Sequence, residues 1–217
     1  MEISIKIPTG LDEISLGQYQ KFLKIQEENE DKNFIAQKMV EIFCNIPLDQ
    51  VVRLRYSDVQ KITEIMTKML DAKPSMTEMF KLKGVEYGFI PNLDQISFGE
   101  FVDLDSYLQD WTKMHLAMNV MYRPVDIQAK GRYNIKEYKP GDADHLKDMP
   151  LGIALASIFF LLNLGKELSQ VMMDYLDQGK IKEVDQVKEA LQKNGVGINH
   201  FTSSLRGILQ DLNISLK

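Results

Sequence analysis

The sequence predicts an α+β fold that is predominantly helical, in which a strand–helix–helix unit with short β-hairpins occurs twice and an all-helical C-terminal part follows. Three observations support this fold class. Apolar residues recur at helical spacing over most of the chain, short alternating segments interrupt them, and a nine-residue motif is repeated. We expect a single compact domain over residues 1–217, with a first repeat at 1–78, a second repeat at 79–140 and a helical C-terminal part at 141–217.

The first repeat begins with an alternating segment, in which polar residues separate Ile3, Ile5 and Ile7 as in a half-buried strand. Three amphipathic helices are expected to follow. Their apolar stripes are, in chain order, Leu16, Tyr19, Phe22 and Leu23; Ile35, Met39, Ile42, Phe43 and Ile46; and Val59, Ile62, Ile65, Met66, Met69 and Leu70. Pro47 ends the second helix, and Ser57 is the expected N-cap of the third.

The second repeat begins with a predicted hairpin, whose strands 80–82 and 85–89 flank a turn at Lys83-Gly84. A helix is expected near 106–122, because large apolar residues recur there at spacings of four and three. These residues are Tyr107, Trp111, Met114, Met118 and Met121. A second short hairpin is expected from Ile127 to Tyr138, with its turn at 129–131.

The C-terminal part contains the most apolar segment of the chain, 149–165, which carries no charge. At about 1.5 Å per residue this helix is shorter than the roughly 30 Å hydrocarbon core of a bilayer. We therefore interpret it as a helix buried on all sides, with membrane contact as the alternative. It is expected to continue to a stop at Gly179. Two more helices are expected, at 184–191 and, after a cap at Asn199, at 201–212.

The repeated motif reads Leu-Asp-Glu-Ile-Ser-Leu-Gly-Gln-Tyr at residues 11–19 and Leu-Asp-Gln-Ile-Ser-Phe-Gly-Glu-Phe at 93–101, with five of nine positions identical. Each copy follows an Ile-Pro pair and contains an S-x-x-E/Q capping box, formed by Ser15 with Gln18 and by Ser97 with Glu100. In such a box the serine hydroxyl accepts from the third helical amide, and the Gln or Glu accepts from the serine amide. We interpret the four residues as structural caps, with two equivalent docking surfaces as the alternative.

Composition and motifs indicate no catalytic residue and no cofactor. With 26 Lys+Arg against 31 Asp+Glu, the formal charge of −5 counts against a general nucleic-acid binder. The single cysteine, Cys44, cannot form an internal disulfide and is expected to behave as a small hydrophobe in an apolar helix. Phosphate-loop, dinucleotide-binding, zinc-protease and nucleophile-elbow motifs are missing from the sequence. The N-terminal residues do not follow the pattern of a secretory signal.

The densest polar cluster lies at 142–148 and contains three aspartates and His145. As a metal site, it would make the chain a metal-dependent enzyme; its spacing does not match an EF-hand, and we interpret it as an acidic helix start. Asp105 is interpreted as an N-cap and His115 as a partly buried packing residue. The twelve methionines are interpreted as adaptable core filling, with a repackable partner surface as the alternative.

The stretch Phe89–Asp105, with Trp111, Met114-His115 and Met121-Tyr-Arg-Pro124, resembles proteins encoded in the structural-gene region of tailed phages, in particular the crAss-like phages of gut Bacteroidetes. The apolar segment after Asp148-Met-Pro is similar too, so the resemblance covers about residues 89–165. It implies a non-enzymatic virion protein, either a portal- or tail-associated component or a cargo protein packaged and ejected with the genome. No functional residue carries over from the resemblance.

The resemblance also implies partners and a location. The expected partners are other phage structural proteins and further copies of the chain, as a homo-oligomer or ring, because phage connectors are cyclic assemblies. No specific nucleic acid is expected. The expected location is the virion, and the host cytoplasm during assembly. The alternative function is a phage assembly chaperone or adaptor that is absent from the mature particle.

Overall fold

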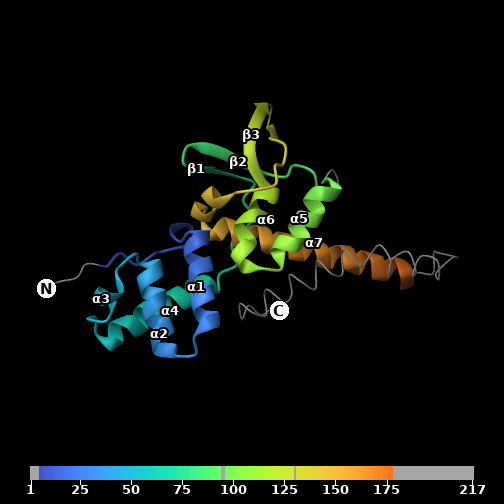
Figure 1. Cartoon of the computed structure of the whole chain (residues 1–217). Coiled ribbons are helices and arrows are strands. Elements are labelled where there is room, and N and C mark those ends of the chain that lie inside the picture. The colour runs from blue at the N-terminus through green and yellow to red at the C-terminus, as the bar shows by residue number, and fades with distance from the viewer. Residues whose placement is uncertain (1–4, 94–95, 130, 178–217) are drawn as a thin grey trace.

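The computed structural model describes residues 5–93, 96–129 and 131–177 (Figure 1). The fold is α+β and predominantly helical, as the apolar periodicities predicted. The helices are α1 (Leu16–Glu28), α2 (Lys32–Phe43), α3 (Leu48–Val51), α4 (Tyr56–Leu70), α5 (Phe98–Leu108), α6 (Met114–Met121) and α7 (Leu151–Asp177). The strands are β1 (Met79–Leu82), β2 (Val85–Phe89), β3 (Tyr122–Ala129) and β4 (Arg132–Ile135). The 3₁₀ turns among the described residues are η1 (Leu11–Glu13), η3 (Trp111–Lys113) and η4 (Asp144–Asp148).

Two helix pairs organise the described chain. Helix α1 packs on α2, and α5 packs on α6. Each pair starts at a copy of the repeated motif, and each ends a few residues before a proline, Pro47 or Pro124. Figure 1 shows α1–α4 at one end of the molecule and the sheet, with α5 and α6 beneath it, at the other.

The four strands form one antiparallel sheet in the order β1-β2-β3-β4. Both predicted hairpins are present. At the first turn, Lys83 and Gly84 both have positive φ, 49° and 85°, the combination that a tight two-residue hairpin turn needs. The second hairpin begins earlier than predicted, because β3 starts directly after α6. Tyr133 of β4 reaches across to β2, and its hydroxyl donates to the Phe89 carbonyl at 2.9 Å.

The first part of the apolar helix α7, from Leu151 to Leu162, lies in the core, as predicted. All side chains from Leu151 to Phe159 are buried. Ser157 contacts Met118 of α6 at 3.6 Å, which places the two helices against each other. No helix in the described part of the chain has the length and apolar character needed to cross a membrane. The expected stop at Gly179, the cap at Asn199 and the helices at 184–191 and 201–212 lie outside the described residues.

The predicted N-terminal strand is wrong over its described part. Residues 5–9 form no strand, although Ile5 and Ile7 pack partly against the core. Instead, Ser15 forms an isolated antiparallel bridge with Pro150. Alternating apolar residues allow one face of a segment to be buried, but a strand also needs a neighbouring chain to pair its backbone groups. Within the described residues, the strand–helix–helix unit is therefore complete in the second copy and lacks its strand in the first.

Three predicted boundaries are also wrong. The helix expected near 106–122 is divided into α5 and α6, because Asp110 caps a new turn by accepting from the Thr112 amide at 2.9 Å. Asp105 consequently lies inside α5 and is not an N-cap. Helix α4 begins after Arg55, so Ser57 lies within its first turn. The apolar stripe stays in phase across residues 109–113, and periodicity therefore cannot detect the break.

Candidate interaction surface

Both capping boxes are present, and their geometry is the same. At α1, Ser15 Oγ accepts from the Gln18 amide at 3.1 Å and the Ser15 amide donates to Gln18 Oε1 at 2.9 Å. At α5, Ser97 Oγ accepts from the Glu100 amide at 3.2 Å and the Ser97 amide donates to Glu100 Oε2 at 2.7 Å. These bonds satisfy amides that a helix start otherwise leaves without a partner.

The chain enters both helices in the same way. The Ile14 amide donates to the Leu11 carbonyl at 3.3 Å, and the Ile96 amide donates to the Leu93 carbonyl at 3.2 Å. The same amide-to-carbonyl hydrogen bond therefore precedes the two caps. The repeated motif builds one local structure twice.

The Gln or Glu of each box, which is the third residue of its helix, also links the helix start to the end of the following helix. Gln18 Nε2 donates to the Ile42 carbonyl at 2.6 Å and to Asn45 Oδ1 at 3.1 Å, at the end of α2. Glu100 Oε1 pairs with Arg123 Nη1 at 2.8 Å, just after α6. The first tie is neutral, whereas the second is an ion pair.

The Glu100–Arg123 pair is largely buried, with side-chain exposures of 10% and 12%. Burial opposes ionisation of Glu100, but hydrogen bonds from Ser97 and the Arg123 guanidinium outweigh it and keep its pKa below the ordinary value. A cleft of about 630 Å³ lies beside the pair. Its lining includes Ile96, Ser97, Asp126, Asn134, Ile135 and Tyr138.

The start of α1 is covered by a distant part of the chain. Leu16 is completely buried. The Leu16 amide donates to the Met149 carbonyl at 2.9 Å, and the Leu151 amide donates to the Ile14 carbonyl at 2.8 Å. We call Met149–Leu151 the covering segment. It lies antiparallel to residues 14–16 and shields the first turn of α1 from water.

Gly17 is part of this contact. A Cβ atom at position 17 would lie 3.1 Å from both the Cβ and the carbonyl oxygen of Lys147, just before the covering segment. Its counterpart, Gly99, has no atom within 4 Å of the corresponding position. The close approach of the covering segment therefore accounts for Gly17, while nothing in the described structure contacts the same face of α5.

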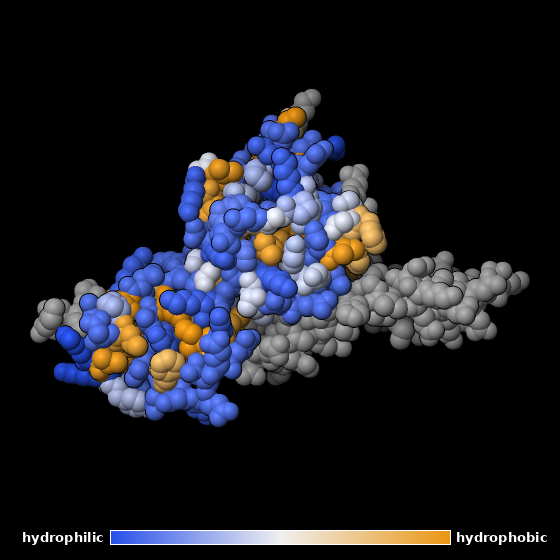
Figure 2. All heavy atoms as spheres, viewed as in Figure 1, coloured by the Kyte–Doolittle hydropathy of each residue, from blue (hydrophilic) through white to orange (hydrophobic). Residues whose placement is uncertain are grey.

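The start of α5 is exposed, whereas the start of α1 is covered. Phe98, the counterpart of Leu16, is 83% exposed, and Val102, one turn further, is 45% exposed. In the described part of the chain, nothing pairs with the Phe98 amide or the Ile96 carbonyl as the covering segment pairs with Leu16 and Ile14. Figure 2 shows apolar side chains gathered over α5. We call Ile96, Phe98, Gly99 and Val102 the open helix start.

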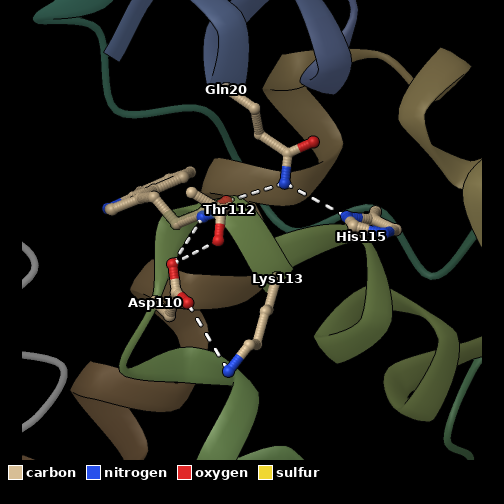
Figure 3. A network of polar contacts seen from close by, with 6 residues as sticks. Gln20, Asp110, Thr112, Lys113 and His115 are labelled. Carbon is tan, nitrogen blue, oxygen red and sulfur yellow. Dashed lines mark hydrogen bonds and ion pairs between the residues drawn. The ribbon is translucent and has the colours of Figure 1, made fainter. Parts of the chain in front are cut away.

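The next turn of α1 is also covered, this time by the second helix pair. Gln20, the counterpart of Val102, is buried; its Nε2 donates to the Trp111 carbonyl at 2.7 Å and lies 3.2 Å from His115 Nδ1 (Figure 3). The ring of Tyr19 meets Trp111 edge-on, with centroids 5.3 Å apart. The same network in Figure 3 includes Asp110, which caps η3 and pairs with Lys113 at 3.6 Å.

His115 is held neutral at this junction. Burial is the largest influence and lowers its pKa, Lys147 lowers it further, and Asp144 and Asp142 partly oppose both. Gln20 donates to Nδ1, so the proton of the neutral ring lies on Nε2, which faces Asp144 Oδ1 at 3.4 Å. The histidine acts in packing and hydrogen bonding, as its place on the apolar stripe suggested.

The acidic cluster at 142–148 includes η4, and its carboxylates pair both locally and with other parts of the fold, as Asp148 does with Lys83 of the first hairpin turn. Asp142 Oδ1 accepts from the Asp144 amide at 2.8 Å, and Asp144 pairs with Lys147 Nζ at 2.7 Å. His145 lies against the ring of Tyr87. Over the described ranges, no group of three or more His, Cys, Asp or Glu side chains is arranged to hold a metal ion. Asp103 of α5 accepts from the Tyr138 hydroxyl at 2.8 Å.

The cysteine and methionines pack as apolar residues. Cys44 caps the end of α2 and is buried, and burial raises the pKa of its thiol to about 11. Met66, Met114, Met118 and Met121 are fully buried. Core filling therefore describes these methionines, and the partner-surface alternative does not.

Sequence reasoning identified the four capping residues but not the residues that distinguish the two copies, which are Phe98, Val102 and Arg123. A signal for Phe98 is present in the sequence: it is a large apolar residue that belongs to no predicted stripe.

A second apolar surface lies over α3 and α4, where Val52 and Tyr56 are exposed beside a groove of about 480 Å³ (Figure 2, lower left).

Comparison with models of protein families, with curated proteins and with solved structures finds no match to this chain.

Proposed function

We propose that this chain is a non-enzymatic bacteriophage virion protein, a portal- or tail-associated component or a packaged cargo protein, that acts by contacting other structural proteins. The resemblance of residues 89–165 to phage structural proteins supports the class. The observation that carries the contact role is Phe98, which is 83% exposed at the position where the first copy buries Leu16. A large aromatic side chain beside a half-exposed valine makes an apolar patch that a partner can cover.

In the described part of the chain, the charged side chains of Glu100 and Asp144 form ion pairs within the fold, which agrees with a role in protein contacts rather than in catalysis. Glu100 is tied to Arg123, and Asp144 to Lys147. The Glu100–Arg123 pair joins two segments of the fold, whereas Asp144 and Lys147 lie within η4, and replacing either pair is expected to change stability.

The alternative, an assembly chaperone or adaptor, is supported by the methionine-rich helices and by the acidic charge of the chain. The burial of Met66, Met114, Met118 and Met121 removes the first of these supports over α4 and α6. We therefore favour the virion component.

Mass spectrometry of purified particles tests the proposal. We expect this chain in several copies per particle, in a fixed ratio to the major capsid protein, and a cyclic assembly in maps of the particle. An abundant host cytoplasmic protein serves as the contamination control. Absence from particles, together with a stoichiometric complex with a tail or capsid protein in infected cells, would establish the adaptor instead.

A further inference from the structure

We propose that the open helix start of α5 binds an extended apolar–proline–apolar segment of a partner protein, in the way that the start of α1 binds the covering segment of its own chain. The inference rests on the proposed function, because the partner is taken to be another structural protein. It goes further by stating the chemistry of the ligand and the register of its backbone.

The molecule contains the receptor geometry twice. The same turn, the same serine cap and the same first helical turn occur at Ile14–Gly17 and at Ile96–Gly99. In the first copy, these backbone groups form hydrogen bonds with the covering segment of the same chain. In the described part of the chain, no other segment pairs with the corresponding groups of the second copy.

The covering segment shows which ligand this geometry accepts. Met149 supplies an acceptor to the Leu16 amide, and Leu151 supplies a donor to the Ile14 carbonyl. Pro150 lies between them, opposite Ser15, at a position from which no donor is required. Proline also fixes φ near −65° and so keeps the ligand close to its extended form before binding.

The ligand side chains are apolar. Met149 and Leu151 are fully buried in the folded chain. At the second copy, Phe98 and Val102 offer an apolar surface of the same character. Gly99 leaves the room beside the helix that Gly17 leaves for Lys147.

The core of the ligand needs no charge at the open helix start. The carboxylate of Glu100 is already paired with Arg123 and therefore needs no further counter-ion. The adjoining cleft is lined by Ile135 and Tyr138 together with charged side chains, among them Asp126, so the residues flanking the apolar core of the ligand can be polar.

The probe is a synthetic peptide with the sequence of residues 146–152, Leu-Lys-Asp-Met-Pro-Leu-Gly. It is titrated into the full ¹⁵N-labelled chain, and amide shifts are recorded by NMR. We expect saturable shifts centred on Ile96, Phe98 and Gly99. A peptide with serine in place of its methionine and second leucine should give none.

Three variants make the test specific. Phe98→Glu should abolish the saturable shifts, and because Phe98 is exposed this variant is expected to fold. Phe98→Leu, which copies the residue of the first repeat, should keep them. Ile127→Glu, a control at a residue that is 59% exposed on β3, should leave them unchanged.

Absence of saturable shifts, or equal shifts in Phe98→Glu, would overturn the inference. Self-association of the wild-type chain that Phe98→Glu abolishes would also overturn it, since the occupant would then be a second copy. The proposed function fails separately, when the chain is missing from purified particles, so the two failures are distinguishable.

Discussion

The two helix starts share a sequence motif, a preceding turn and a capping box, yet one is buried and the other is open. At α1, Leu16 is fully buried beneath Met149–Leu151, while at α5 its counterpart Phe98 is 83% exposed. The motif therefore determines local geometry and leaves burial undetermined. Burial follows from whether a distant segment arrives to pair with the helix start.

The ties between the paired helices differ in the same way. Gln18 reaches a carbonyl and an amide oxygen at the end of α2, whereas Glu100 reaches a guanidinium at the end of α6. One exchange of amide for carboxylate thus changes a neutral tie into a largely buried ion pair. The four predictions below test these contrasts.

The largest expected effect is at the covered helix start. Leu16→Ala should lower the free energy of unfolding by about 3–4 kcal/mol, because it removes a fully buried side chain and leaves a cavity. Phe98→Ala should change it by less than about 0.5 kcal/mol, since the ring is exposed. Urea unfolding of both variants measures the contrast, and equal losses would show that the start of α5 is also covered.

The ion pair comes next. Arg123→Met should cost about 3 kcal/mol, because it leaves the Glu100 carboxylate largely buried without its partner. The double variant Glu100→Gln with Arg123→Met should recover part of this loss, since it leaves no unpaired charge. Gln18→Leu at the neutral tie should cost about 1–2 kcal/mol. A loss in the double variant as large as in Arg123→Met would argue against the charge as the cause.

A smaller difference is expected at the two glycines. Gly17→Gln should cost about 2 kcal/mol, because the new side chain must displace Lys147 and the covering segment. Gly99→Gln should be neutral or slightly stabilising, since its site is open and Gly is a poor helix former. Thermal unfolding of the pair gives the comparison; a lower Tm for Gly99→Gln than for Gly17→Gln would contradict it.

The smallest effect concerns pH at the junction of the two helix pairs. The pKa of His115 is lower in the folded chain than its unfolded value of about 6.5, so the unfolded chain takes up the proton first. The stability due to neutral His115 is complete above about pH 6.5 and is lost as the pH falls towards the folded pKa. In His115→Gln, unfolding free energies between about pH 7 and pH 5 should fall less steeply than in the wild type. A parallel pH profile would assign the dependence to other groups.

Much of the fold could be predicted from periodicity and turn chemistry. The stripes located α1, α2, α4 and the buried start of α7, and Lys83-Gly84 located a hairpin. Prediction failed where two different structures have the same pattern of apolar residues. The alternating segment at 5–7 packs against the core but forms no backbone pairs with a neighbouring strand. The apolar stripe at 107–121 continues in phase across the break between α5 and α6 at Asp110.

For the candidate surface, the sequence alone determined the two capped helix starts, because a capping box needs only residues that lie within four positions of each other. The tertiary structure decided which start is covered, since the pairing of Leu16 with Met149 joins residues more than a hundred positions apart. It also decided that Arg123 meets Glu100. Local bonds can be predicted from neighbours in the chain, whereas burial depends on which distant segment the packed core brings to the same place.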